Sequence, residues 1–172
     1  MSRLTSMSPE AIKQMFSPDS DADLITLLTF YENNGTTVLA RLANSYTKRI
    51  SETADEVLYG VTSRGIDYTF LPFEITLPSE EEANAPRCSV VMHDVTRYLT
   101  PIIRTITKPV EVKIELVLNK SPDTVEILLE DFEIRNFVYT AEQVTAELTM
   151  VSLDREPFPM YSYTPQFNPG MF

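Results

Sequence analysis

Alternation of apolar and polar residues is the dominant pattern along the chain, and it predicts β-strands. The clearest run covers residues 110–118, where every second side chain is aliphatic: Val110, Val112, Ile114, Leu116 and Leu118. Glu111, Lys113 and Glu115 fill positions between them. Side chains two residues apart lie on the same face of a strand, so this strand is expected to have one face against a core and the other in water.

Two strands joined by a tight turn are predicted near the start of the chain. Residues 24–31 and 36–42 are rich in strand-forming side chains. Asn33-Asn34-Gly35 between them predicts a hairpin, since Asn and Gly tolerate positive φ. The following residues, 43–65, are polar and turn-prone, and only 57–59 is expected to form a short edge strand there.

A proline interrupts the next predicted strand. Apolar residues alternate over 66–70 and again, on the opposite parity, over 73–77. Pro72 lies between the two runs, and a proline with a change of parity predicts a bend or bulge.

Three further strands are predicted in the second half of the chain. They cover residues 88–95, residues 125–134 and residues 144–150. The second of them follows a turn at 119–123 and pairs back on the strand at 110–118. Its apolar parity changes at Glu130-Asp131, which predicts a β-bulge there.

Two short helices complete the predicted elements. Ser8 is a plausible N-cap before Pro9, and the helix it opens carries one apolar face: Ala11, Ile12, Met15 and Phe16. Residues 96–106 show helical spacing, with Thr96 or Thr100 as the expected cap and Pro101 limiting the helix upstream.

These patterns together predict a mainly β protein of seven to nine strands. The expected fold is an antiparallel β-sandwich or partly open barrel with a short N-terminal helix, one central helix and an extended C-terminal arm. We assign residues 1–20 to an N-terminal helical arm, residues 21–154 to the β domain and residues 155–172 to the C-terminal arm.

The C-terminal arm carries the strongest candidate for a binding function. Pro157, Pro159, Pro165 and Pro169 exclude a helix, and six large apolar side chains between and beyond them need a surface to cover them. That surface is either the body of the chain itself or a neighbouring subunit, and the density of aromatics favours the neighbour. The predicted subunit contacts are Phe158, Pro159, Tyr161, Tyr163, Phe167, Pro169, Met171 and Phe172.

Composition and charge restrict the possible partners. The chain has 172 residues, enough for one domain with a sizeable core, and a formal net charge of −11. Such a balance argues against nucleic-acid binding and against an anionic membrane surface. Cys88 is the only cysteine, so no internal disulfide is expected, and its strand context predicts a buried small apolar residue. With neither a signal sequence nor a transmembrane run, assembly in a cytoplasm is expected.

The polar clusters are weak candidates for chemistry. Asp19-Ser20-Asp21-Ala22-Asp23 resembles the start of a calcium loop, but Leu24 and Phe30 occupy the positions that require Gly and Glu. His93 is the only histidine, and the strand directs His93 and Asp94 to opposite faces, so they do not form a base with its orienting carboxylate.

Three other polar features have ordinary explanations. Ser89 and Thr96 are hydroxyls near His93 without the context of a nucleophile. Glu80-Glu81-Glu82 is a charged loop that would serve at most to dock a basic partner, and Arg64 beside Gly65 suits an exposed turn. We therefore predict no catalytic residue, no metal site and no cofactor, and do not expect an enzyme.

Several segments resemble a family of bacteriophage tail proteins of unassigned biochemical role. The resemblance spans roughly residues 20–172 and is most specific at the C-terminus. It rests on residues 24–30, on Thr62-Ser63-Arg64-Gly65, on residues 70–78, on residues 117–126, on Glu156-Pro157-Phe158-Pro159 and on residues 164–172.

This resemblance implies a structural virion component at the distal end of a long, non-contractile tail. By analogy with other tails, such a protein forms a homo-oligomeric ring that joins the tail tube to the tip or hub. Sixfold symmetry is favoured over threefold because the chain is short for a multi-domain hub. The implied partners are the tube, hub and tape-measure proteins, with DNA only passing through the lumen and no membrane.

Two alternatives to a tail-tip protein are less well supported by the residues. A carbohydrate- or receptor-binding β-sandwich should carry exposed aromatics in its loops, whereas this chain has no Trp and concentrates its aromatics in strands and the arm. A hydrolase needs a convergent polar site, for which one His and one Cys offer little.

Overall fold

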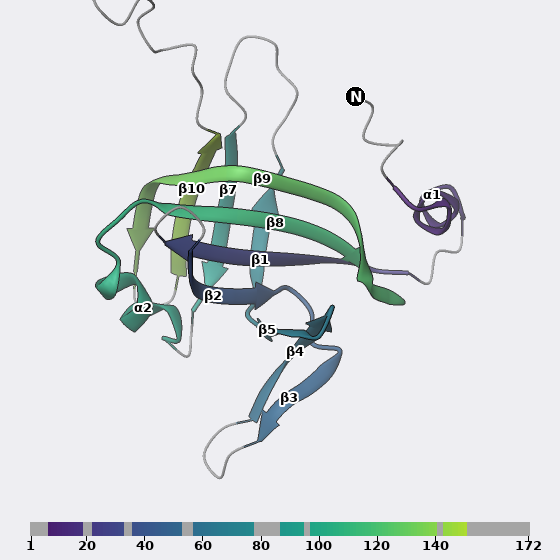
Figure 1. Ribbon diagram of the computed structural model, residues 1–172, viewed down its shortest axis with the longest axis horizontal. Helices are drawn as coiled ribbons and strands as arrows, with labels where there is room; N and C mark the ends of the chain where they lie inside the picture. The colour runs from purple at the N-terminus through teal and green to yellow at the C-terminus, as the bar shows by residue number, and fades with distance from the viewer. Residues whose placement is uncertain are drawn as a thin grey trace, which may run out of the picture.

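The computed structural model describes residues 7–18, 22–32, 36–52, 57–77, 87–94, 97–140 and 143–150, and in them the protein is mainly β. Ten strands form one open sheet in the order β3-β4-β5-β2-β1-β8-β9-β10-β7-β6 (Figure 1). The strands are β1 (Leu24–Glu32), β2 (Thr37–Ala43), β3 (Lys48–Glu52), β4 (Val57–Ser63), β5 (Ile66–Phe70), β6 (Phe73–Thr76), β7 (Arg87–His93), β8 (Val110–Leu118), β9 (Ser121–Tyr139) and β10 (Gln143–Met150). Neighbouring strands are antiparallel except β2 and β5, which are parallel.

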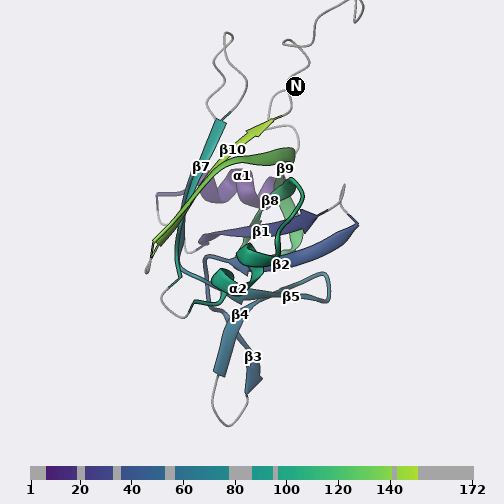
Figure 2. The ribbon, with the colours of Figure 1, turned by 90° about the vertical axis from the view of Figure 1, so that its left-hand side faces the viewer.

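The sheet curls into two layers, and the long strand β9 belongs to both of them. This 19-residue strand pairs with β8 along its first part and with β10 along its second. Figures 1 and 2 show β1, β2 and β8 running across the direction of β7 and β10, with β9 turning from one direction to the other. Such a corner is typical of orthogonal sheet packing.

A bulge at the predicted position produces this turn of β9. Val112 pairs with Phe132 and Ile114 with Leu129, so the two strands lose register across Glu130 and Asp131. Asp131 has a φ of 66°, in the left-handed region that few non-glycine residues adopt. The predicted bulge at Glu130-Asp131 is therefore confirmed.

The main core lies between the two layers and is built by the alternating residues of the predicted strands. Its fully covered members from both layers include Leu28, Val112, Ile114, Phe132, Val90, Met92, Val144, Ala146 and Leu148. Each large apolar side chain buried there contributes roughly 1.5–3 kcal/mol. The alternation predicted for residues 144–150 is confirmed, because Val144, Ala146 and Leu148 all face this core.

The predicted bend at Pro72 joins two distant parts of the sheet. The Leu71 amide donates to the carbonyl oxygen of Ala43 in β2 at 3.0 Å, and the His93 amide in β7 donates to the Pro72 carbonyl oxygen at 2.9 Å. The chain thereby passes from β5, beside β2, to β6, beside β7. Of the two predicted architectures, this single curled and unclosed sheet corresponds to the partly open barrel.

The prediction for residues 43–65 was wrong in one respect. This segment contains β3 as well as β4, and β4 lies between β3 and β5, so β3 and not β4 is the edge strand. Most of β3 is exposed on both faces. A strand without a buried face shows no apolar alternation, which is why its sequence did not reveal it.

β4 and β5 cover the outer face of β1 and β8, opposite the main core. A second apolar cluster lies there, formed by Ile25, Leu27, Ala43, Val61, Tyr68 and Val117. Residues of β1 are consequently buried on both faces. The prediction of one wet face for residues 110–118 was therefore wrong for the second half of β8, where Glu115 and Val117 are also buried.

The N-terminal helix α1 (Pro9–Met15) begins as predicted at Ser8. The Ser8 hydroxyl accepts from the Ala11 amide at 3.1 Å. Both the amide and the hydroxyl of Ser8 donate to the buried carboxylate of Glu126, at 2.7 and 2.8 Å. Glu126 lies where the β8–β9 register shifts, so a second bulge supplies the anchor of the helix.

The predicted apolar face of α1 is only partly used. Ala11 is buried, whereas Met15 and Phe16 are 57% and 76% exposed. The hydrogen bonds of its N-cap fasten the helix to Glu126, and they lie at the opposite end from these two side chains.

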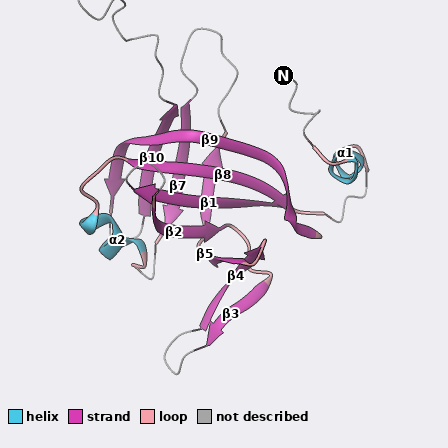
Figure 3. Cartoon of the chain, viewed as in Figure 1, coloured by secondary structure: helices cyan, strands magenta, loops and turns pink. Residues whose placement is uncertain are grey.

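The central helix α2 (Leu99–Thr105), cyan in Figure 3, is shorter than predicted. Its cap also differs from the predicted one. The buried Asp94 carboxylate accepts from the amides of Tyr98, Leu99 and Thr100 at 2.7–3.3 Å. Thr100 is thus a donor to the cap and not the cap itself, and Thr96 lies outside the described residues.

Gly60 allows β4 and β5 to approach closely. A Cβ at this position would overlap the backbone carbonyl oxygen of Tyr68 and crowd Ile50. Gly60→Ala should therefore destabilise the protein by roughly 1–3 kcal/mol, because backbone must move to make room. Urea unfolding of both proteins measures this difference.

Gly65 provides the matched control for that experiment. It has a φ of +75°, and nothing lies within 4 Å of the position of its Cβ. Gly65→Asn should cost less than about 1 kcal/mol, since Asn tolerates this conformation. Equal losses for the two variants would contradict the steric explanation of Gly60.

Candidate functional site

The β3–β4 hairpin projects from the body of the protein and is the most prominent candidate surface. Figures 1 and 2 show it extending beyond β5 at the end of the molecule away from the outer tip of β10. β3 pairs only with β4, so its other edge presents backbone N–H and C=O groups without ladder partners among the described residues. Such an edge is a ready template for pairing with another chain.

Large apolar side chains of the hairpin and of the residues beside it form one surface, which we call the aromatic face: Tyr46, Phe70, Tyr59 and Val57. Phe70, at the end of β5, is half-buried, and the other three are exposed. Tyr46 packs edge-on against Phe70, with ring centroids 5.0 Å apart. Gly60 pairs with Thr69, which places Tyr59 in register beside Phe70. Tyr46 is 68% exposed, Tyr59 48% and Val57 41%.

The aromatic face continues the surface by which β4 and β5 pack on the body. Val61 and Tyr68 face the second cluster and are buried. Val57 and Tyr59 precede Val61 at intervals of two residues, so they lie on the same face of β4 but project past the edge of the body. The hairpin therefore extends an apolar packing surface into solvent.

Polar contacts at the turn between β4 and β5 hold this unit on the body. The Ser63 hydroxyl donates to the Pro122 carbonyl oxygen at 2.7 Å, and the Arg64 amide donates to the Asp123 carboxylate. Arg64 has a φ of 50° and Gly65 a φ of 75°. The predicted exposed turn at Arg64 is thus a strained turn that is fastened to the start of β9.

A buried carboxylate completes the anchor. Glu115 on β8 is almost fully buried, and its Oε2 accepts from Arg64 Nη2 at 2.6 Å and from the Tyr68 hydroxyl at 3.3 Å. Lys113 Nζ lies 3.5 Å from Glu115 Oε1 and 2.9 Å from Glu130. A buried carboxylate that is hydrogen-bonded and ion-paired fixes the positions of its partners. Removing one partner destabilises the fold, because an uncompensated charge is left buried.

The surroundings of Glu115 shift the ionisation of the whole group. Burial pushes the pKa of Glu115 upward, but the hydrogen bond and charge of Arg64, the charge of Lys113 and the Tyr68 hydroxyl outweigh it, so the pKa is lowered. The hydrogen bond to Glu115 raises the pKa of Arg64. Burial raises the pKa of Tyr68. Glu115 and Arg64 are therefore both ionised in the folded protein near neutral pH.

Sequence reasoning missed Glu115 and Glu126 as anchoring residues. Glu115 occupies a polar position of an alternating strand, and the burial comes from β4 and β5, whose crossing leaves no local signal. Arg64 was predicted to be an exposed turn residue, and it is exposed in the turn, but its ion pair with the buried Glu115 was not predicted.

The structure does not bring the predicted catalytic candidates together. His93 is exposed at the end of β7, and Asp94 is buried beneath α2 as its cap. Ser89 lies four residues from His93 on the same strand, a separation of roughly 13 Å. These positions do not give a base in contact with a nucleophile.

Several of the remaining charged candidates cannot be placed in the described part of the chain. Asp19, Asp21 and Glu80-Glu81-Glu82 lie outside the described residues. Within the described ranges, no group of three His, Cys, Asp or Glu side chains has the arrangement of a metal site. Neither described helix has the length and apolar content needed to cross a membrane.

Cys88 behaves as predicted for a buried small side chain. It is 3% exposed in the main core, and burial raises its pKa to about 11. A thiol in this environment is mostly protonated and unreactive at neutral pH.

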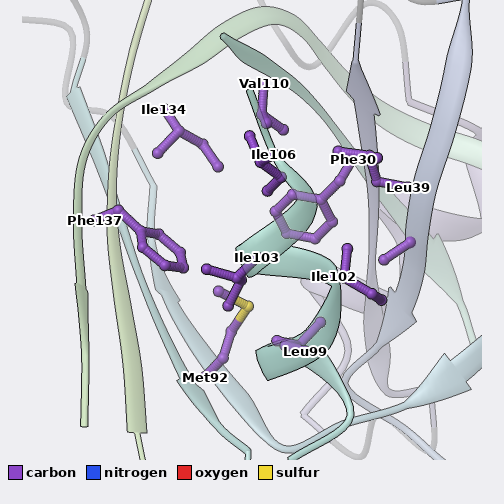
Figure 4. Close-up of a pocket in the computed structure, with 11 residues that line it drawn as sticks. Phe30, Leu39, Met92, Leu99, Ile102, Ile103, Ile106, Val110, Ile134 and Phe137 are labelled. Carbon is purple, nitrogen blue, oxygen red and sulfur yellow. The ribbon is translucent and has the colours of Figure 1, made fainter. Parts of the chain in front are cut away.

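An apolar cavity of about 30 Å³ lies under α2. In Figure 4, Leu99, Ile102, Ile103 and Ile106 of the α2 segment turn toward Phe30, Met92 and Phe137. The space is about that of one water molecule, and its lining offers no polar group to hold one. It is a gap in packing and gives no recognition site for a ligand.

The predicted contacts of the C-terminal arm lie outside the described residues. These are Phe158, Pro159, Tyr161, Tyr163, Phe167, Pro169, Met171 and Phe172. They remain a prediction, and so does the choice between packing on the same chain and packing on a neighbour.

Comparison with known protein families finds a match over most of the chain. Residues 41–163 match a family described as a domain of unknown function, DUF1833. No curated protein matches the chain.

Glu115→Gln should destabilise the protein by about 1.5–3 kcal/mol at neutral pH, because it removes a charged hydrogen bond at a buried position. The pKa of Glu115 is lowered on folding, so its contribution is present above the ordinary value of 4.5 and is lost as pH falls through the lowered pKa. The difference between wild type and variant should therefore shrink below about pH 4.5 in urea unfolding.

Glu130→Gln is the control for this measurement. Glu130 is paired with the same Lys113, but its side chain is 51% exposed, so its loss should cost less than about 1 kcal/mol. A Glu115→Gln loss as small as that of Glu130→Gln, or one independent of pH, would contradict the anchoring role.

Proposed function

The chain belongs to the DUF1833 family, which is described as a domain of unknown function. From the resemblance of its sequence to bacteriophage tail proteins, we propose that it is a structural component of a bacteriophage tail tip. Domains of this family are associated with phages. The proposed role is a ring that joins the tail tube to the distal tip or hub, as the resemblance of its sequence to tail proteins implies. The protein would assemble in the host cytoplasm and function in the virion.

The aromatic face of the β3–β4 hairpin is the observation that carries this proposal. A projecting hairpin with exposed Tyr46 and Tyr59 and an open edge at β3 has the features of a contact surface. The C-terminal arm offers further apolar side chains that need a partner surface. A β domain with two such extensions suits a protein whose role is to contact copies of itself and other structural proteins.

Ring symmetry follows from the form of these contacts. The hairpin and the arm are different segments of the chain, and a contact between different surfaces of identical chains builds a ring when its rotation closes. We favour a sixfold ring, matching a tail tube, over the threefold symmetry of a hub, because this chain is short for a multi-domain hub. The tube, hub and tape-measure proteins are the proposed neighbours.

The net charge of −11 suits a lumen through which DNA passes without binding. The surface that lines the ring should then be negative. The electrostatic potential of an assembled ring determined by cryo-electron microscopy tests this expectation, and a positive lumen would count against it.

Self-association through the arm is the first property to test. We expect the full chain to form a closed oligomer and a chain that stops after Asp154 to be a folded monomer, because the arm supplies the contact. Light scattering after gel filtration gives the masses, and circular dichroism reports whether the shortened chain keeps its β structure.

A full-length variant keeps this test interpretable if the shortened chain does not fold. Phe167→Ser together with Phe172→Ser removes two aromatic contacts and leaves the length unchanged, and it should also yield monomer. An oligomer that persists in both variants, or a full chain that is monomeric at all concentrations, would contradict self-assembly through the arm.

A further inference from the structure

We propose that the β3–β4 hairpin is the acceptor for the C-terminal arm of a neighbouring copy, with residues 160–164 added as a strand to the open edge of β3. This inference rests on the proposed ring assembly and names the surface that the arm occupies. It places Tyr161 and Tyr163 of one chain beside the aromatic face of the next.

The open edge of β3 has the length and the chemistry for such a strand. β3 spans Lys48–Glu52, five residues, and all but Ile50 are exposed. The backbone groups on its outer edge have no ladder partner in the described part of the chain. Added strands bind through these groups, and side chains on alternate positions give specificity.

The prolines of the arm leave one short segment able to make this pairing. Pro159 and Pro165 bound residues 160–164, whose sequence is Met-Tyr-Ser-Tyr-Thr. Proline cannot donate to a ladder, so the prolines confine regular pairing to this stretch. Its five residues equal the length of β3, and tyrosine and threonine favour strands.

Alternation then puts both tyrosines of the arm on one face. Tyr161 and Tyr163 are two residues apart, so they point to the same side of an added strand. Arg49 of β3 pairs directly with Tyr59 of β4 and lies on the same face as Tyr59. We place the arm tyrosines on this face, where the Arg49 side chain lies between them and Tyr59 and the aromatic face becomes continuous.

The positions of hairpin and arm favour a contact between copies. β10 ends at Met150, and Figures 1 and 2 show this end of β10 and the hairpin at opposite ends of the molecule. Residues 151–172 follow, which span roughly 70 Å when extended at about 3.3 Å per residue. Donor at one end and acceptor at the other is the arrangement of a head-to-tail assembly.

Two full-length variants test the proposal by mixing. Tyr59→Asp alters the acceptor, and the double variant Tyr161→Ser with Tyr163→Ser alters the donor. Each alone should associate about 30-fold more weakly than wild type, as expected for a central tyrosine contact. An equimolar mixture should form a 1:1 heterodimer and nothing larger, because only one intact donor and one intact acceptor remain.

Tyr139→Asp is the matched control. Tyr139 is an aromatic residue at the end of β9 with 58% exposure, similar to Tyr59, and its replacement should leave the oligomer mass unchanged. Circular dichroism and the unfolding midpoint of Tyr59→Asp must match those of Tyr139→Asp for the comparison to hold, which the exposure of both residues leads us to expect.

A disulfide between copies provides an independent readout of register and partner. Ser51→Cys and Ser162→Cys, each in a chain of different mass, should form an oxidised heterodimer, since paired strand residues are within disulfide reach. The native Cys88 is buried with a raised pKa and should not compete. In a chain that carries both Ser51→Cys and Ser162→Cys, a disulfide within that one chain would show that the arm pairs with the hairpin of its own chain, and this would overturn the proposal.

Other outcomes separate this inference from the proposed function. If the arm variant becomes monomeric while Tyr59→Asp assembles normally, the arm is a contact but the hairpin is not its acceptor. If Ser51→Cys forms disulfides with itself, the hairpin pairs with a second hairpin and the proposal is wrong. If wild type never assembles, the ring itself is contradicted.

Discussion

The bend of β9 at Glu130 and Asp131 is the constraint on which the rest of the fold depends. Because this one strand pairs with β8 before the bend and with β10 after it, it turns a single sheet into two layers that face each other. The cost is a non-glycine residue, Asp131, in the left-handed region, of order 1–3 kcal/mol. The gain is a closed apolar core from Leu28 to Leu148, which exceeds that cost several times over.

The folding of the sheet into layers also explains why charged residues are buried in this protein. The curl of the sheet covers one face of β1 and β8, and β4 and β5 cover the other. The Glu115 carboxylate is therefore removed from contact with solvent. Arg64, Tyr68 and Lys113 replace that water as partners. Glu126 and Asp94 follow the same rule at the helix starts, where backbone amides and a hydroxyl satisfy the carboxylates. Three buried carboxylates thus fix three outlying units, namely the β4–β5 turn, α1 and α2.

A feature of the fold could be predicted from the sequence only where neighbouring residues in the chain determine it. Strands with one buried face, such as β10, and the bulge in β9 follow from the alternation of neighbouring residues. β3 has no buried face, and its sequence therefore carries no alternation to detect. Glu115 is buried by strands about fifty residues away in sequence, and no pattern within β8 reveals that cover. Asp94 caps α2 from outside the predicted helix, while Thr96 and Thr100 were the nearer and chemically suitable choices.

An exposed edge strand promotes unspecific pairing and aggregation. The sequences of β3 and of the arm would restrict this pairing to one specific contact. Edges are commonly protected by short length and by lysine, and β3 has both in its five residues beginning at Lys48. A partner strand with many residues would still pair along it and continue to the next chain. The prolines at 159 and 165 would stop such pairing after five residues. A copy with one such donor and one such acceptor would contact only two neighbours, which excludes branched aggregation, and a ring forms when the rotation between neighbours closes.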